Sequence, residues 1–176
     1  MKQNILNWLI GIFLVGIHTT TQAQSIDAGG WHTLAICSNG TVKAFGENAS
    51  GQLGNGALLT ATQGSPSLVD TSTITGSKIF VQLSAAVTHT CGVMTDGAIY
   101  CWGSDAAGLL GNGATAGTQS SPSAVDRTGV TGNTSFIQVS AGTEHTCGIT
   151  SSGKAYCWGS DGFGELGNEV TTFMAS

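Results

Sequence analysis

The chain has 176 residues and a formal net charge of −5 at pH 7, with 5 Lys and Arg against 10 Asp and Glu. Nucleic-acid affinity comes mainly from basic side chains that neutralise phosphates, and anionic lipid attracts polybasic patches, so this composition argues against both partners. The length suits one ordinary domain.

The N-terminus has the features of a secretory signal peptide, which we assign to residues 1–23. One basic residue, Lys2, precedes an apolar run from Ile5 to Ile17 that is too short to span a bilayer comfortably. Small residues at the next junction predict cleavage after Ala23, with an uncleaved membrane anchor as the alternative. We therefore expect residues 24–176 to be secreted, periplasmic or on the cell surface, without stable membrane insertion.

Three segments of the remaining chain align without gaps around a histidine, which indicates a repeat array. The histidines are His32, His89 and His145, spaced 57 and 56 residues apart. In each unit an aromatic residue lies 13 positions after the histidine, and Leu-Gly-Asn begins 21 positions after it. The aromatic residues, each followed by glycine, are Phe45 with Gly46, Trp102 with Gly103, and Trp158 with Gly159.

Each unit is predicted to form short antiparallel strands. In the second unit we expect strands at 80–83, 90–94 and 98–102 and a fourth near 122–125. Four such strands in about 55 residues are typical of a β-propeller blade, and one blade cannot bury both faces of its sheet alone. The sequence therefore predicts an all-β, partial β-propeller of about three four-stranded antiparallel blades. The repeats cover about 26–70, 79–126 and 136–170, and the third is incomplete.

The repeated pattern resembles a known family. Gly-x-x-His-Thr, a glycine turn, and then Trp-Gly-x-Asp/Asn-x-x-Gly-x-Leu-Gly-Asn are similar to the regulator of chromosome condensation repeat, over about Ile26 to Asn168. The resemblance implies a seven-bladed propeller when complete. Three blades would then be a fragment of a longer protein, the product of a truncated gene, or a unit that closes a ring by oligomerising. Open blade edges favour self-association.

The cysteines indicate two disulfides. Pairing the second and third strands of each unit places Cys91 opposite Cys101 and Cys147 opposite Cys157, and directly opposed residues are close enough to bridge. Export to an oxidising compartment agrees with this pairing. Cys37 is left unpaired, either as a small buried thiol or as a link to a missing blade or second chain.

We weighed zinc at the repeated group of His89, Cys91 and Cys101. The spacing lacks any Cys-x-x-Cys knuckle, so we expect no metal, and no motif points to a cofactor. The first unit has Leu34 and Ala44 at the two cysteine positions. That apolar pair predicts that the site faces a packed layer.

The repeated side chains are expected to be structural. A catalytic base is needed once, whereas the histidine recurs in every unit, so we expect each to hydrogen-bond backbone at the inner turn of its blade. The aromatic residues are expected in the core between blades. Asp105, Asp161 and Asn48 occupy one turn position, where the side chain can bond nearby backbone amides. Trp31 has no aromatic counterpart, so it either packs on the first blade or is an exposed binding anchor.

The leading functional hypothesis is a binding module without catalysis. Longer, variable connections at 57–65 and 114–121 should gather on one face of a propeller and recognise a protein or a glycan. The alternatives are a propeller domain of a larger secreted enzyme and a truncated, non-functional product. Guanine-nucleotide exchange with chromatin binding is opposed by the signal peptide, the disulfides and the acidic balance.

Overall fold

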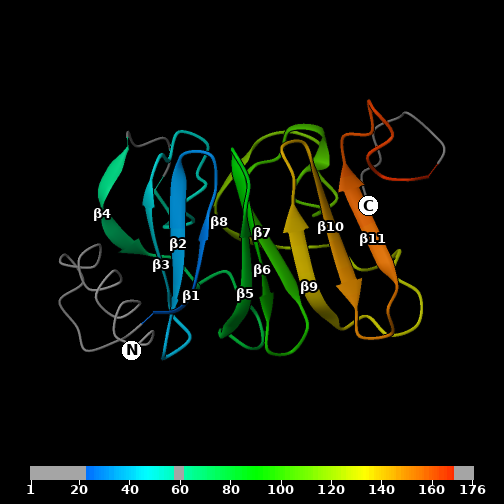
Figure 1. The fold of residues 1–176 in the computed structure, drawn as a ribbon, viewed down its shortest axis with the longest axis horizontal. Helices are drawn as coiled ribbons and strands as arrows, with labels where there is room; N and C mark the ends of the chain where they lie inside the picture. Colours follow the sequence, from blue (N-terminus) through cyan, green and yellow to red (C-terminus); the bar gives the residue numbers. More distant parts are fainter. Residues whose placement is uncertain (1–22, 58–61, 169–176) are drawn as a thin grey trace, which may run out of the picture.

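The computed structural model describes residues 23–57 and 62–168 (Figure 1). The predicted signal peptide therefore lies outside the described residues, except for Ala23. In the described part of the chain, no helix has the length and hydropathy needed to cross a membrane.

The chain forms three antiparallel sheets that follow one another in sequence and stand side by side (Figure 1). We call them blades 1, 2 and 3. The strands of blade 1 are β1 (Ala23–Ala28), β2 (His32–Cys37), β3 (Val42–Gly46) and β4 (Gln63–Leu68). Those of blade 2 are β5 (Phe80–Ala85), β6 (His89–Met94), β7 (Ile99–Ser104) and β8 (Thr118–Ala124), with a short 3₁₀ turn η1 (Ala106–Gly108) between the last two. Those of blade 3 are β9 (Phe136–Ala141), β10 (His145–Thr150) and β11 (Ala155–Gly159).

Each sheet has the strand order of its sequence, β1-β2-β3-β4, β5-β6-β7-β8 and β9-β10-β11. This arrangement confirms the all-β prediction and the partial propeller. The third blade has three strands within the described residues, which end at residue 168.

The outermost strands begin earlier than we predicted. The connection that we expected over 114–121 ends in β8, where Thr118 pairs with Ser104 and Gln119 pairs with Gly103. Similarly, Gln63 at the start of β4 pairs with Gly46. These strands consist mainly of Ser, Gln, Thr and Pro, so they carry no alternation of apolar and polar residues that sequence reasoning could detect.

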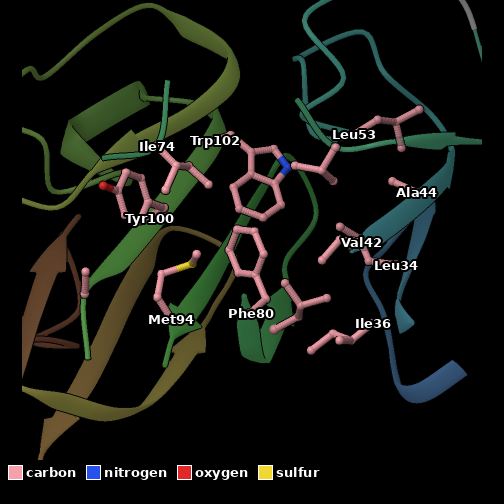
Figure 2. Packing of buried hydrophobic residues seen from close by; sticks show 13 residues of the cluster. Leu34, Ile36, Val42, Ala44, Leu53, Ile74, Phe80, Met94, Tyr100 and Trp102 are labelled. Atoms are coloured by element: carbon pink, nitrogen blue, oxygen red, sulfur yellow. The ribbon is translucent and has the colours of Figure 1, made fainter. Parts of the chain in front are cut away.

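The core lies between the blades. Figure 2 shows Phe80 and Trp102 of blade 2 lying between their own sheet and the apolar side chains of blade 1. The two rings meet edge to face, with centroids 5.7 Å apart. A second cluster repeats this contact between blades 2 and 3, with Phe136, Val139 and Trp158 packed on the cysteine pair of blade 2.

Each contact between neighbouring blades joins one face of the first blade to the opposite face of the second. One blade supplies large side chains from its first and third strands, and we call this its inserting face. The preceding blade receives them on its second and third strands and its Leu-Gly-Asn loop, and we call this its receiving face. Because a fully buried large apolar side chain contributes roughly 1.5–3 kcal/mol, blade stacking is the main source of stability.

Candidate functional site

The repeated histidines bridge neighbouring blades. Nε2 of His32 lies 2.8 Å from Oγ1 of Thr90 in blade 2, and Nε2 of His89 lies 2.9 Å from Oγ1 of Thr146 in blade 3. Each threonine hydroxyl donates onward to a carbonyl oxygen of the blade that supplies the histidine, at Gln52 and Leu109. A carbonyl only accepts, so the hydroxyl hydrogen is committed to it and the imidazole must donate from Nε2.

We had expected these histidines to bond backbone within their own blade, and that expectation is wrong. The ring instead points across to the next blade, because alternate side chains of β2 and β6, beginning with the histidine, face that neighbouring sheet, and the intervening ones face the other way. The threonine that accepts the bond follows the next histidine directly in sequence. The recurring His-Thr pair is therefore one connector whose two halves serve opposite faces of a blade.

The buried histidines are held neutral. Burial lowers the pKa of His89 from 6.5 to about 4, and the neighbouring His32 and His145 act in the same direction. Burial also lowers the pKa of His32 to about 4, against an opposing effect of Asp27. Nδ1 of both rings is buried without a hydrogen-bond partner. A second proton would have no acceptor there, so these rings are poor candidates for acid–base chemistry.

The tryptophans that follow the histidines donate hydrogen bonds to the same two carbonyl groups. Nε1 of Trp102 donates to the Gln52 oxygen at 2.9 Å, and Nε1 of Trp158 donates to the Leu109 oxygen at 3.0 Å. Both tryptophans are fully buried between blades, at 0% and 2% exposure. The side chain of Phe45 in blade 1 has no N–H group, and it is half-buried, since no blade precedes it in the described chain.

The glycine after each aromatic residue allows the hairpin to close around the histidine. The three glycines pair directly with the histidine of their own unit: Gly46 with His32, Gly103 with His89, and Gly159 with His145. Each has a positive φ, between +107° and +115°. A side chain on Gly103 would place its Cβ 2.7 Å from the His89 Cα, so only glycine fits.

The turn position after these glycines behaves as predicted. The Oδ1 atoms of Asn48, Asp105 and Asp161 accept hydrogen bonds from the amides of Leu53, Leu110 and Leu166, at 3.0, 3.1 and 2.9 Å. Burial raises the pKa of Asp105, although its bonds to the Leu110 amide and the Asn112 side chain oppose the rise. This turn fixes the Leu-Gly-Asn loop that reaches the next blade.

The structure contains two disulfides, Cys91–Cys101 and Cys147–Cys157, with the residues of each pair directly opposite in register. Cys37 is a buried free thiol. Leu34 and Ala44, the counterparts in blade 1, are also opposite one another and fully buried. Within the described residues, no group of three or more His, Cys, Asp or Glu side chains is arranged to hold a metal ion.

Sequence reasoning missed the bonds between the first strands of neighbouring blades. Gln82 of β5 bonds both the N–H and the C=O of Val139 in β9, each at 2.7 Å. Oδ2 of Asp27 accepts the Ala85 amide at 2.6 Å, and Oγ of Ser84 accepts the Ala141 amide at 2.9 Å. The repeat alignment held a signal for them, because Asp27, Ser84 and Ser140 all lie five residues before the histidine.

The exposed surface contrasts with this buried framework. The connection from residue 113 to 117 is exposed throughout, and Trp31 is 71% exposed. Strand direction places both at one end of the blades, with the turns that follow β1, β5 and β9 (Figure 1). The other predicted recognition connection, 57–65, lies partly outside the described residues, at 58–61.

Known proteins match both the sequence and the fold. The Regulator of chromosome condensation (RCC1) repeat matches residues 23–52, 80–108 and 136–165, and a second profile of this repeat matches 96–149. The human Probable E3 ubiquitin-protein ligase HERC3 is 31% identical over 144 residues, which are 82% of this chain and 13% of HERC3. Protein pim1 of Schizosaccharomyces pombe is 32% identical over 155 residues, covering 77% of this chain and 27% of pim1.

Solved structures agree on the fold. Yeast RCC1 (Prp20), bound to Kap60, superimposes with a TM-score of 0.74 at 19% identity, covering 87% of this chain and 36% of that one. Human WBSCR16 gives a TM-score of 0.73 at 22% identity, covering 90% of this chain and 38% of that one. The chain thus spans well under half of the relatives that it matches. With three matched repeats and three matching blades, this chain belongs to the RCC1 repeat family.

Proposed function

We propose that the chain is an exported, non-catalytic binding module that recognises a partner protein through the connections at one end of its blades. We call this end the loop end, and it includes Trp31 and residues 113–117. The observation that supports the proposal is that shared and unshared side chains lie in different parts of the structure. The side chains that the three units share are committed to contacts within and between blades, whereas Trp31 and the connection 113–117, which the repeat pattern does not require, are exposed at the loop end.

Trp31 supports this assignment. An indole that is 71% exposed gains little from folding but can bury a large area against a partner at small cost in side-chain entropy. Its counterparts in the other units are Thr88 and Glu144, so the repeat itself does not require an aromatic residue there. The absence of catalysis is part of the proposal, because the buried histidines lack the accessible, titrating nitrogen that a general base needs.

Site-specific photo-crosslinking tests the loop end. A photoreactive residue is placed at Trp31, at the exposed Thr115, or at Ile79, which is 49% exposed near the opposite end of the blades. We expect one protein from the extracytoplasmic fraction to crosslink at Trp31 and Thr115 but not at Ile79. Trp31→Ala should abolish the crosslink at Thr115. Equal crosslinking from all three positions would contradict the proposal.

Export has its own test. Protein recovered outside the cytoplasm should begin at Gln24 and contain one titratable thiol, from Cys37, after unfolding. Cleavage after Ala23 would leave most of β1 in place, since that strand continues to Ala28. An intact N-terminus or five free thiols would contradict the proposed export.

A glycan is the second candidate ligand, favoured by one groove. It has a volume of about 450 Å³ and is lined by Thr73 and residues 118–124 of β8, with no charged side chain among them. Hydroxyl and amide groups of this kind suit a neutral sugar. Binding to a glycan array that is lost on Ser121→Leu, but kept in Trp31→Ala, would favour this ligand over a protein partner.

A further inference from the structure

One residue pair at the loop end of blade 1 sets an aromatic side chain beside a carboxylate. The ladder between β2 and β3 matches His32 with Gly46, and the Glu47 amide donates to the Trp31 carbonyl oxygen at 2.9 Å. Trp31 and Glu47 are therefore the next directly opposed residues, just beyond the two strands. Directly opposed residues of an antiparallel pair have Cβ atoms about 4.5–5.5 Å apart on one face of the sheet, so these two side chains are neighbours.

The other two blades show that the repeat does not require this combination. At the same place the Ser104 amide donates to the Thr88 carbonyl oxygen in blade 2, and the Ser160 amide donates to the Glu144 carbonyl oxygen in blade 3. The backbone contact is thus common to all three blades and needs no particular side chains. Among the described blades, blade 1 alone has an aromatic ring and a carboxylate together at this place.

The position of Trp31 is accessible in packed blades too. Glu144, its counterpart in blade 3, is exposed although blade 3 inserts its large apolar side chains into blade 2. Thr88, its counterpart in blade 2, is only half-buried with a blade packed on each side. Solvent therefore reaches this position between neighbouring blades as well as at the 71% exposed Trp31.

Charge divides the three blades between their two ends. The solvent-accessible carboxylates in the described segments of the loop end belong to Glu47, Glu144 and Glu165. No Lys or Arg lies in those described segments. The basic residues of the described chain lie in the turns at the opposite end or near the start of β3, which is at that end: Lys78, Arg127, Lys154 and Lys43. The loop end of these blades therefore has a negative potential, which attracts a positively charged partner surface.

The carboxylate of Glu47 is not used by the fold. Within residues 23–57 and 62–168, it accepts no hydrogen bond and forms no ion pair. Other acidic side chains serve turns: Oε2 of Glu165 accepts the Phe163 amide at 2.8 Å, and Oδ1 of Asp96, at the opposite end, accepts the Ala98 amide at 3.0 Å. The Glu47 carboxylate therefore keeps its full capacity to accept hydrogen bonds from a ligand.

We propose that Trp31 and Glu47 bind an arginine side chain in a basic segment of the partner protein. The proposal rests on the proposed recognition of a protein at the loop end, and it names the chemistry of that partner. A guanidinium stacks on an indole face through its planar surface and donates to a carboxylate from its edge, so one arginine satisfies both groups. Lysine fits less well, because its compact ammonium cannot stack and donate in this way. The negative potential of the loop end adds a salt-dependent attraction.

Fluorescence anisotropy with labelled peptides tests the site on the full exported chain. The probe is a short peptide of alternating Arg and Gly, compared with peptides that carry Lys or the neutral analogue citrulline in place of Arg. We expect the Arg peptide to bind, the Lys peptide to bind more weakly and the citrulline peptide not to bind. Glu47→Gln and Trp31→Leu should each weaken binding of the Arg peptide about tenfold. The double variant should be little weaker than either single variant, because both groups contact one guanidinium.

Asp96→Asn is the matched control. It removes the same charge at the opposite end, and the Asn oxygen can still accept the Ala98 amide, so binding of the Arg peptide should be unchanged. Circular dichroism checks that all variants remain folded. A wild type that does not bind the Arg peptide, or binds the citrulline peptide equally well, overturns the proposal. Wild-type affinity in Glu47→Gln, or an equal loss in Asp96→Asn, overturns it too.

Crosslinking from Thr115 separates this proposal from the proposed function. We expect the partner crosslinked there by the wild type to be lost in Glu47→Gln and to be reduced as the salt concentration rises. A partner that crosslinks equally in Glu47→Gln and at high salt would overturn the arginine site while leaving recognition at the loop end intact. No partner crosslinked by the wild type, with the Arg peptide still bound through Glu47, would overturn the proposed function while leaving the arginine site intact.

Discussion

Acidification should weaken the contacts between blades through His32 and His89. Each has a folded pKa of about 4, below the 6.5 of an exposed imidazole. Between these two values the unfolded chain binds more protons than the folded chain, so stability falls as the pH falls. The contribution is complete above pH 6.5 and is lost progressively as the pH approaches 4. The physical reason is that a doubly protonated ring would leave the Nδ1 proton buried without an acceptor.

The size of the effect follows from the two pKa values. Integrating proton uptake between pH 7.0 and 5.5 gives a loss of about 1.2 kcal/mol in unfolding free energy for each histidine. The two together therefore contribute about 2.4 kcal/mol. His89→Gln should remove half of this pH dependence, since a Gln amide can still donate to the Thr146 hydroxyl but does not titrate. Asp105, whose pKa is raised, changes stability in the opposite direction. Its contribution cancels when wild type and variant are compared.

Urea denaturation at the two pH values measures this difference. Wild type and variants are compared at one low protein concentration, so that the midpoints can be compared directly. His145→Gln is the matched control, because it removes a histidine from the same repeat position on the open face of blade 3. Equal pH dependence with and without His89→Gln would contradict this account, and so would an equally large change in the His145→Gln control.

Two further predictions use differences between the units as internal controls. Gly111→Ala should lower the unfolding free energy by about 3 kcal/mol, because φ there is +60° and the new Cβ would lie 2.7 Å from Nε1 of Trp158. Gly167→Ala should lower it by about 1 kcal/mol, because φ is +67° but no atom lies within 4 Å of the new Cβ. Thermal unfolding of both variants compares them, and equal losses would show that the contact with the indole contributes nothing. Asp105→Asn, which copies Asn48 of blade 1, should stabilise the chain by about 1 kcal/mol at pH 7. The folded pKa of Asp105 is raised, so the gain should disappear in acid, and a gain independent of pH would rule out a charge effect.

The sequence repeat alone predicts much of the fold. Identical offsets around His32, His89 and His145 define three equivalent units, and apolar strands with turn glycines define a sheet in each. Opposed positions across one hairpin depend only on the local register, which is why the pairing of Cys91 with Cys101 could be derived from the sequence. The amide bond of Asp105 is also local, since donor and acceptor lie five residues apart.

The partner of each histidine could be found only from the packing of the sheets. Thr90 lies 58 residues from His32, and nothing in the local pattern states that the ring crosses to another sheet. The same applies to Gln82 and Val139, which are 57 residues apart. The polar strands β4 and β8 were located only through their pairing with β3 and β7, because strands at the outer edge of a blade are not selected for buried apolar side chains.

Local sequence thus specifies what each unit is: its strands, its turns and its disulfide, all formed by residues close together in the chain. How one unit recognises the next is set only when the sheets pack, because that contact joins groups 37 to 58 residues apart in the chain, on different sheets. The same packing sets which side chains are buried. Burial of Leu83 and Val139 depends on the blade that packs against them, and no local pattern of residues records that.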